Sequence, residues 1–275
     1  MGVVHNLLND PRFEVIVKPE RALRSLLMRS SASFATRLRW DAFDRPQYAY
    51  GIYQAAVEAR MLGMGAISVA EIGVASGDGL VAMERIAAEV ERVTAVEIAV
   101  YGFDTGTGMP PPTDNRDLPY AWDSGFYGMD EQALRRRLSR AKLVIGDVAQ
   151  TAPAFAEEDR PPLGYAAVDV DYYSSTVATF PIFEAAESRL LPRTFLHFDD
   201  VVGDDRELHS PFAGQLAAIV DFNAAHEGRK LAKVHAFRHK RIIDAAWHDQ
   251  LHVLHCFDHS RYADYVYSAE RELPR

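Results

Sequence analysis

The length, composition and charge of the chain exclude several classes of protein. It has 275 residues, of which 48% are hydrophobic and 25% are charged. This balance is typical of a globular protein with a large core, and it excludes disordered, collagenous and coiled-coil chains. The formal net charge is −9, from 30 basic and 39 acidic residues, and such a charge repels nucleic acids and anionic membranes.

Targeting signals and cysteine content predict the compartment. No stretch approaches the roughly 18 consecutive apolar residues of a transmembrane helix, and residues 1–11 lack the basic start and apolar centre of a secretory signal. Cys256 is the single cysteine, so it cannot form an internal disulfide, in agreement with a reducing compartment. We therefore expect a cytoplasmic protein with no membrane partner and no nucleic-acid partner.

Helical periodicity comes first along the chain, and a strand pattern follows it. Apolar residues recur at helical spacing over 20–28 and 46–62, and Pro46 suits the first turn of the second helix. From residue 66 short apolar runs alternate with amphipathic segments, which is typical of βαβ units with a buried parallel sheet. The predicted strands are 67–74, 98–104, 143–148, 165–171 and 194–199.

Two later apolar runs, 234–243 and 252–257, are predicted to pair as an antiparallel edge. The predicted fold class is therefore α/β, a doubly wound and mostly parallel sheet with an N-terminal helical extension. We divide the chain into a helical cap, residues 1–65, and a main domain, residues 66–275. Tyr50 and Tyr53 in the cap are candidates for a homodimer interface or for a cover over the binding crevice.

A glycine-containing turn follows the first predicted strand. Residues 71–79 read EIGVASGDG, in which glycines allow close backbone approach and the next helix offers free N–H groups to a ligand. The spacing matches neither the dinucleotide fingerprint nor the phosphate loop, and no lysine follows. The alternative is a plain strand-to-helix turn. If the turn binds a ligand, its contacts come from Glu71, Gly73, Ala75, Ser76 and Gly77.

Acids end the later strands. Asp104 and Thr105 follow the second strand, where a doubly wound fold binds ribose hydroxyls, and Asp147 ends the third. Asp169 and Asp171 lie two residues apart on a predicted strand, which would place both carboxylates on one face.

The pair Asp199 and Asp200 ends the fifth strand, so the carboxylates of both pairs should converge outside the carboxyl ends of the sheet. Such a repulsive group needs protons or a hard cation such as Mg²⁺, Mn²⁺ or Ca²⁺. Helix capping or a solvated loop is the alternative interpretation of these acids.

Four motifs together resemble a known family. The first, E-x-G-x-x-x-G, resembles motif I of class I S-adenosylmethionine-dependent methyltransferases, with Ala75 where many members have glycine. The sequence YGFDTGTGMP at 101–110 is similar to the FDTFEGMP pattern of the macrocin O-methyltransferase family, which methylates sugar hydroxyls. DVDYYSST at 169–176 and FDD at 198–200 resemble the family's later motifs. The resemblance spans about residues 67–200, and it lacks the paired glycines usual before the last motif.

The resemblance implies a Rossmann-like methyltransferase fold, S-adenosylmethionine as methyl donor, Mg²⁺ or Mn²⁺, and a small-molecule hydroxyl as acceptor. It implies that residues 66–275 are the catalytic domain. The resemblance implies that Asp169, Asp199 and Asp200 bind the metal and that Asp171 is the general base. The roles of Asp169 and Asp171 could be exchanged. The implied donor-binding residues are Glu71, Gly73, Ala75, Ser76, Gly77, Asp104, Thr105 and Asp147.

Two other functions remain open at this point. The D-x-D at 169–171 also occurs in metal-dependent glycosyltransferases that hold a nucleotide-sugar diphosphate, and a non-catalytic protein could keep the fold alone.

Residues 107–129 are long for a connection, and we predict a lid or a substrate-binding loop there. His252 and His255 are predicted to be exposed on a hairpin, and His197 is predicted to be a buried strand histidine.

Overall fold

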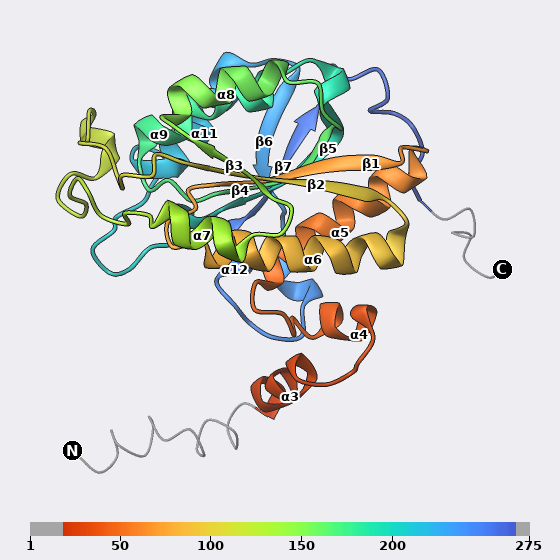
Figure 1. Cartoon of the computed structure of the whole chain (residues 1–275). Helices are drawn as coiled ribbons and strands as arrows, with labels where there is room; N and C mark the ends of the chain where they lie inside the picture. Colours follow the sequence, from red (N-terminus) through yellow and green to blue (C-terminus); the bar gives the residue numbers. More distant parts are fainter. Residues whose placement is uncertain (1–18, 268–275) are drawn as a thin grey trace, which may run out of the picture.

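A seven-stranded sheet forms the centre of the protein (Figure 1). The computed structural model describes residues 19–267, so the segment 1–11, for which no secretory signal is predicted, lies outside the described residues. The strand order is β3-β2-β1-β4-β5-β7-β6. The strands are β1 (Ala66–Ile72), β2 (Glu97–Asp104), β3 (Lys142–Ile145), β4 (Leu163–Val168), β5 (Leu190–Phe198), β6 (Arg229–Lys233) and β7 (Leu251–Cys256).

The strand directions confirm the predicted fold class. Strands β1 to β5 pair in parallel, and β7 pairs antiparallel with both β5 and β6. The two central strands β1 and β4 are buried on both faces, as expected when helices cover both sides of a parallel sheet. The predicted antiparallel edge is therefore present.

Helices cover both faces of this sheet (Figure 1). One core cluster packs α5 and α6 against one face, and a second packs α8, α10 and α11 against the other. The α-helices are α3 (Pro19–Met28), α4 (Phe34–Arg39), α5 (Pro46–Met61), α6 (Asp78–Thr94), α7 (Glu131–Arg137), α8 (Val148–Glu157), α9 (Tyr173–Ala178), α10 (Phe180–Glu184), α11 (Gly214–Ala225) and α12 (Trp247–Gln250). The 3-10 helices are η1 (Asn115–Asp117), η2 (Glu187–Arg189), η3 (Asp199–Val201) and η4 (Phe237–Lys240). Within residues 19–267, no helix is long and apolar enough to cross a membrane.

The predicted strand 234–243 is wrong. The edge strand β6 lies earlier, and residues 237–240 form the 3-10 helix η4. The sequence of β6 is mostly charged, so it gave no apolar strand pattern. An edge strand exposes most of its side chains and therefore needs few apolar residues. The apolar residue Phe237 instead packs beside Trp247 and Leu251 in a small separate cluster.

The helical segment before β1 packs directly on the sheet. A Cβ atom at Gly51 would lie 2.2 Å from the Tyr165 ring, so α5 approaches β4 at backbone distance. Tyr50 packs against Phe237 with ring centroids 4.7 Å apart, and Tyr53 against Phe34 at 5.4 Å. Both tyrosines thus make contacts inside the chain. The homodimer and the division at residue 65 stay predictions.

Candidate active site

A cavity of about 410 Å³ opens at the carboxyl ends of β1, β2, β4 and β5. A parallel α/β sheet binds ligands at this edge. Of the predicted site residues, only Gly77 does not line the cavity; those that do are Glu71, Gly73, Ala75, Ser76, Asp104, Thr105, Asp147, Asp169, Asp171, Asp199 and Asp200. The described lining residues carry eight carboxylates but a single basic side chain, Arg45.

The turn after β1 requires glycine at two places. Gly73 has a φ of +90°, and a Cβ atom there would lie 1.7 Å from the backbone oxygen of Asp169. Gly77 has a φ of +84°, and a Cβ atom there would lie 2.1 Å from Leu134. Gly77 therefore shapes the start of α6 from behind the cavity.

Ala75 also adopts a left-handed backbone, with a φ of +45°. Left-handed conformation costs an alanine roughly 1–2 kcal/mol, whereas glycine adds about 0.5–1 kcal/mol of unfolded-state entropy. We expect Ala75→Gly to raise the melting temperature by about 1–3 °C, the scale for under 1 kcal/mol in a chain of this size. Calorimetric unfolding checks this, and a melting temperature lowered by several degrees would contradict it.

Asp104 holds the glycine turn in place. Its Oδ2 accepts hydrogen bonds from the backbone N–H groups of Val74 and Ala75, both at 2.9 Å, and its Oδ1 accepts one from Gly106 at 2.7 Å. A carboxylate has about four acceptor sites. Three of these sites are used within the chain, which leaves one for the predicted ribose hydroxyl.

The carboxyl of Glu71 is buried under the turn. Tyr48, from α5, donates a hydrogen bond of 2.5 Å to Glu71 Oε1, while Oε2 is buried without a partner among the described residues. Burial raises the pKa of Glu71 to about 8, although the Tyr48 hydrogen bond and nearby Arg45 oppose the rise. Sequence reasoning did not find Tyr48, because it lies 23 residues before Glu71 on another element.

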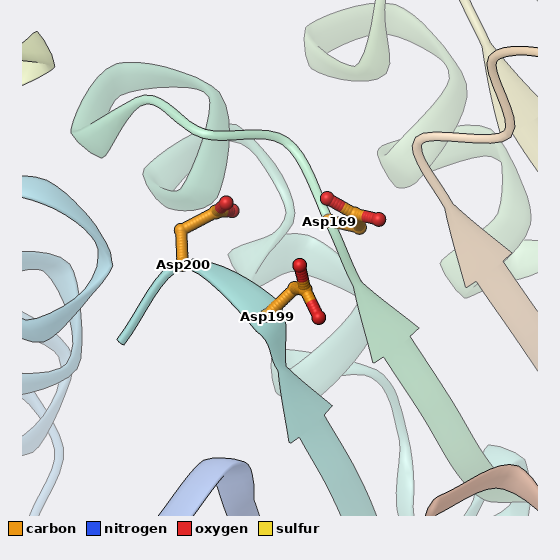
Figure 2. A group of neighbouring side chains, drawn as sticks. All are labelled: Asp169, Asp199 and Asp200. Atoms are coloured by element: carbon orange, nitrogen blue, oxygen red, sulfur yellow. The ribbon is translucent and has the colours of Figure 1, made fainter. Parts of the chain in front are cut away.

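Three carboxylates meet at the ends of β4 and β5 (Figure 2). Asp169, Asp199 and Asp200 each offer an oxygen, and these oxygens all lie within 4.8 Å of one another. Asp169 follows β4 directly, and the other two begin the 3-10 helix η3 after β5. Among the described residues no other group of three metal-binding side chains is this close.

The three carboxylates, which we call the acid cluster, differ in charge state. Burial and the neighbouring carboxylates raise the pKa of Asp169 and of Asp200 well above the usual range. Burial works against ionisation of Asp199 too, but the hydrogen bond and the charge interaction with His197, together with Arg45, outweigh it and lower that pKa. His197 Nε2 lies 3.0 Å from Asp199 Oδ1, and His197 is 1% exposed, as predicted for a buried strand histidine.

Asp171 is not on the strand, so the prediction of adjacent carboxylates on one strand face is wrong. Strand β4 ends at Val168, and the backbone of Asp171 turns left-handed with a φ of +56°. Its N–H donates to Asp200 Oδ2 at 2.8 Å. Burial raises the pKa of its own carboxyl to about 6. Asp171 thus lines the cavity beside the acid cluster but outside it.

Two glutamines that the sequence did not single out fix the cluster. Gln215 of α11 accepts a hydrogen bond from the Asp200 N–H and donates one to the Val168 carbonyl, which ties the end of β5 to β4. Gln250 of α12 donates to the backbone oxygen of Asp199 at 2.6 Å. Both lie far along the chain, and a single glutamine carries no distinctive sequence signal.

The position of Asp147 and the exposure of His252 differ from the predictions. Strand β3 ends at Ile145, and Asp147 is the N-cap of α8, where its side chain accepts from the Ala149 N–H at 2.9 Å. Asp147 still lines the cavity. The prediction of exposed histidines is wrong for His252, which is 3% exposed, and burial lowers its pKa to about 4.

Two long loops border the cavity mouth, and both leave the same end of the sheet in Figure 1. The loop after β2 contributes Trp122 and Tyr127, and the loop after β5 contributes Val202 and Glu207. Large apolar side chains on these loops are exposed: Tyr120, Phe126, Tyr127, Val202, Leu208 and Phe212. The predicted role of the first loop as a lid or a substrate-binding loop stays a prediction.

The raised carboxyl pKa values predict how stability depends on pH. Glu71 keeps its proton in the folded state up to about pH 8 but loses it near pH 4 when unfolded. The folded state therefore binds more protons between these values, and stability falls as pH rises. His252 has a pKa of about 4 when folded and near 6.5 when unfolded, so part of its own contribution falls at the lower end of the window from pH 6.5 to 8.5. The difference from a Glu71→Gln variant therefore isolates Glu71.

We expect the metal-free protein to lose about 2 kcal/mol across that window from Glu71 alone. Denaturant unfolding at pH 6.5 and 8.5 measures the loss, and Glu71→Gln is the control, which should reduce the dependence by that amount and leave the part that comes from Asp169 and Asp200. The same pH dependence in the parent and in Glu71→Gln would show that Glu71 ionises normally.

Comparison with known proteins finds similarity to solved structures. No family model matches the chain, and no curated protein matches it. Among solved structures, the chain is similar to the crystal structure of CalS11, a calicheamicin methyltransferase. The TM-score is 0.53 at 19% sequence identity, over 90% of this chain and 93% of that chain. The chain has a methyltransferase fold.

Two further structures are more distant. The apo structure of CalS11, described as a TDP-rhamnose 3'-O-methyltransferase of calicheamicin biosynthesis, has a TM-score of 0.41 and 18% identity over 90% of this chain and 95% of that chain. An O-methyltransferase from Bacillus cereus in complex with SAH has a TM-score of 0.40 and 12% identity over 88% and 94%.

Proposed function

We propose that the protein is an S-adenosylmethionine-dependent, divalent-metal-assisted O-methyltransferase that acts on a hydroxyl of a small molecule, a sugar or sugar-bearing metabolite. The observation that carries this proposal is the meeting of three features in one cavity of a methyltransferase fold. These are the glycine turn, the Asp104 carboxylate with one acceptor site open, and the acid cluster.

The charge of the cavity favours this donor over a nucleotide sugar. Eight carboxyl groups line it against one guanidinium, and even with Glu71, Asp169 and Asp200 protonated the other five exceed its charge. S-adenosylmethionine carries a sulfonium and an ammonium against one carboxylate, so its net charge is positive and the cavity attracts it. A nucleotide-sugar diphosphate would be repelled by most of the lining. The glycosyltransferase alternative also leaves the turn held by Asp104 without a use.

The acid cluster fits a hard divalent cation. Its donors are all carboxylate oxygens, with no cysteine or histidine among them, which suits Mg²⁺ or Mn²⁺ better than zinc. Burial of like charges makes the cluster costly without a counter-charge. Asp169, Asp199 and Asp200 would hold the ion, whose bound form supplies Lewis acidity that lowers the pKa of the acceptor hydroxyl.

We assign the role of general base to Asp171, which lines the cavity beside the acid cluster. Its carboxylate takes the proton from the acceptor hydroxyl while the oxygen forms a bond to the methyl carbon. The bond from that carbon to sulfur breaks, its electron pair stays on sulfur, and S-adenosylhomocysteine leaves as a neutral thioether. A base with a pKa of about 6 is ionised at pH 7.5, and general base catalysis typically contributes about 10²- to 10⁴-fold.

The aromatic rim supports a sizeable acceptor. Trp122 and Tyr127 line the cavity, and Phe126 and Phe212 are exposed on the same two loops that contribute to its lining. Sugar rings present apolar C–H faces to aromatic side chains, so a sugar hydroxyl can enter while the rest of the molecule contacts the rim. The similarity of residues 101–110 to the macrocin O-methyltransferase pattern supports the same acceptor class.

Transfer of a labelled methyl group tests the proposal. Purified protein is incubated with methyl-labelled S-adenosylmethionine and a panel of sugars, nucleotide sugars and glycosides, with Mg²⁺ or with a chelator. We expect label in an acceptor with Mg²⁺, and a loss of about 10²- to 10⁴-fold in Asp171→Asn. A panel that yields no labelled product, together with glycosyl transfer from a nucleotide sugar, would refute it.

A further inference from the structure

Arg45 occupies an unusual position in the cavity. It is the only basic side chain among the described residues that line it, and it is the N-cap residue of α5. Its side chain makes no hydrogen bond or ion pair with the described residues. Its guanidinium carbon lies 5.9 Å from the centroid of the Tyr48 ring. A guanidinium has five N–H donors, so Arg45 has donors available for a ligand.

The neighbours of Arg45 are acidic groups at one end of the cavity. Its charge stabilises the ionised carboxylates of Glu71, Asp169 and Asp199 and lowers the pKa of each, against the larger effect of burial. Tyr48 connects the two sides of this corner, because its ring contacts Arg45 and its hydroxyl donates to Glu71. A cation and a buried carboxyl oxygen without a partner therefore lie in the same corner.

We propose that Arg45 binds the α-carboxylate of the methyl donor. The inference rests on the proposed function, since it takes S-adenosylmethionine as the ligand. A carboxylate entering a cavity with eight acids is repelled wherever no cation is near. Arg45 removes that repulsion, and its planar donors match a carboxylate in a two-bond pair.

A different role for Arg45 makes a different prediction. If its charge only screens the acid cluster, its removal should alter cation affinity and should weaken all nucleoside ligands equally. If it binds the α-carboxylate, its removal should weaken only ligands that carry this group. S-adenosylhomocysteine carries the amino acid portion, whereas 5'-methylthioadenosine has the same nucleoside and thioether without it, so the two ligands separate the roles.

Titration calorimetry of both ligands against three proteins provides the test. The proteins are the parent chain, Arg45→Gln, and a control, Arg85→Gln, which removes an exposed arginine paired with Asp44. In Arg45→Gln we expect S-adenosylhomocysteine to bind about 10- to 100-fold more weakly, the range for one or two charge-assisted hydrogen bonds. Binding of 5'-methylthioadenosine should change by less than about twofold, and the control should match the parent.

The outcomes separate this inference from the proposed function. If the parent protein binds neither ligand, the proposed function fails. If the parent binds both and Arg45→Gln binds S-adenosylhomocysteine as tightly as the parent, or weakens both ligands equally, the role of Arg45 is wrong while the function stands. If Arg45→Gln does not fold, Arg45→Lys replaces it; a retained charge without the planar donors should still weaken S-adenosylhomocysteine alone by about 3- to 10-fold.

Discussion

Replacement of Asp169 by asparagine is expected to stabilise the metal-free protein at pH 8 and to abolish its stabilisation by Mg²⁺. Burial and neighbouring carboxylates raise the pKa of Asp169, so its ionisation at pH 8 costs free energy that an amide of the same shape does not. We expect a gain of about 1–2 kcal/mol without metal. Methyl transfer should fall about 10²- to 10⁴-fold, because the ion loses one of three carboxylates.

Thermal unfolding with and without Mg²⁺ measures both effects. Asp159→Asn is the matched control, because the Asp159 side chain is 99% exposed and its ion pair with Arg189 lies at the surface, where such pairs contribute at most about 1 kcal/mol. The parent and the control should gain stability from Mg²⁺, and Asp169→Asn should not. A metal-induced gain in Asp169→Asn equal to that of the parent would place the cation elsewhere.

Replacement of Gly73 by alanine should have the largest effect on the fold near the site. The added Cβ would lie 1.7 Å from the Asp169 backbone oxygen, so β1 and β4 must separate or the turn must rebuild. The backbone hydrogen bond from Asp169 N–H to the Ile72 oxygen, 2.8 Å long, lies in the same place. We expect a loss of about 4 kcal/mol or more, together with at least 100-fold weaker binding of S-adenosylhomocysteine.

Gly63→Ala isolates the contribution of backbone conformation. Gly63 has a φ of +71°, similar in sign to Gly73, but a Cβ there meets nothing within 4 Å. Its replacement should cost only the left-handed penalty, about 1–2 kcal/mol, and should leave ligand affinity unchanged. Denaturant unfolding of the two variants compares them, and equal losses would mean that the close approach to Asp169 has no energetic consequence.

The sheet and the acids at its edge are the parts that the sequence predicts best. Buried parallel strands such as β1 and β4 need continuous apolar runs, and those runs are visible in the sequence. Asp104 and Asp199 then mark strand ends, and parallel strands bring such ends to one edge. Edge strand β6 escaped prediction because its exposed, charged residues carry no periodic signal.

The contacts that complete the site could not be predicted. Arg45 lines the cavity from the N-cap of α5, and Tyr48 of α5 reaches the buried Glu71 carboxyl. Gln215 and Gln250 reach the acid cluster from α11 and α12. These placements depend on how helices pack on the sheet, which a local pattern does not record. The left-handed turn at Asp171 was also missed, because a non-glycine residue with positive φ gives no sequence signal.

Calorimetric titration of the purified protein with S-adenosylhomocysteine, with and without Mg²⁺, tests the central claim most directly. We predict one site per chain with a dissociation constant of about 1–100 μM, and a binding heat that disappears in Asp104→Ala, which releases the turn N–H groups of Val74 and Ala75. The contradicting result is no heat with S-adenosylhomocysteine and metal-dependent binding of a nucleotide sugar in the same cavity.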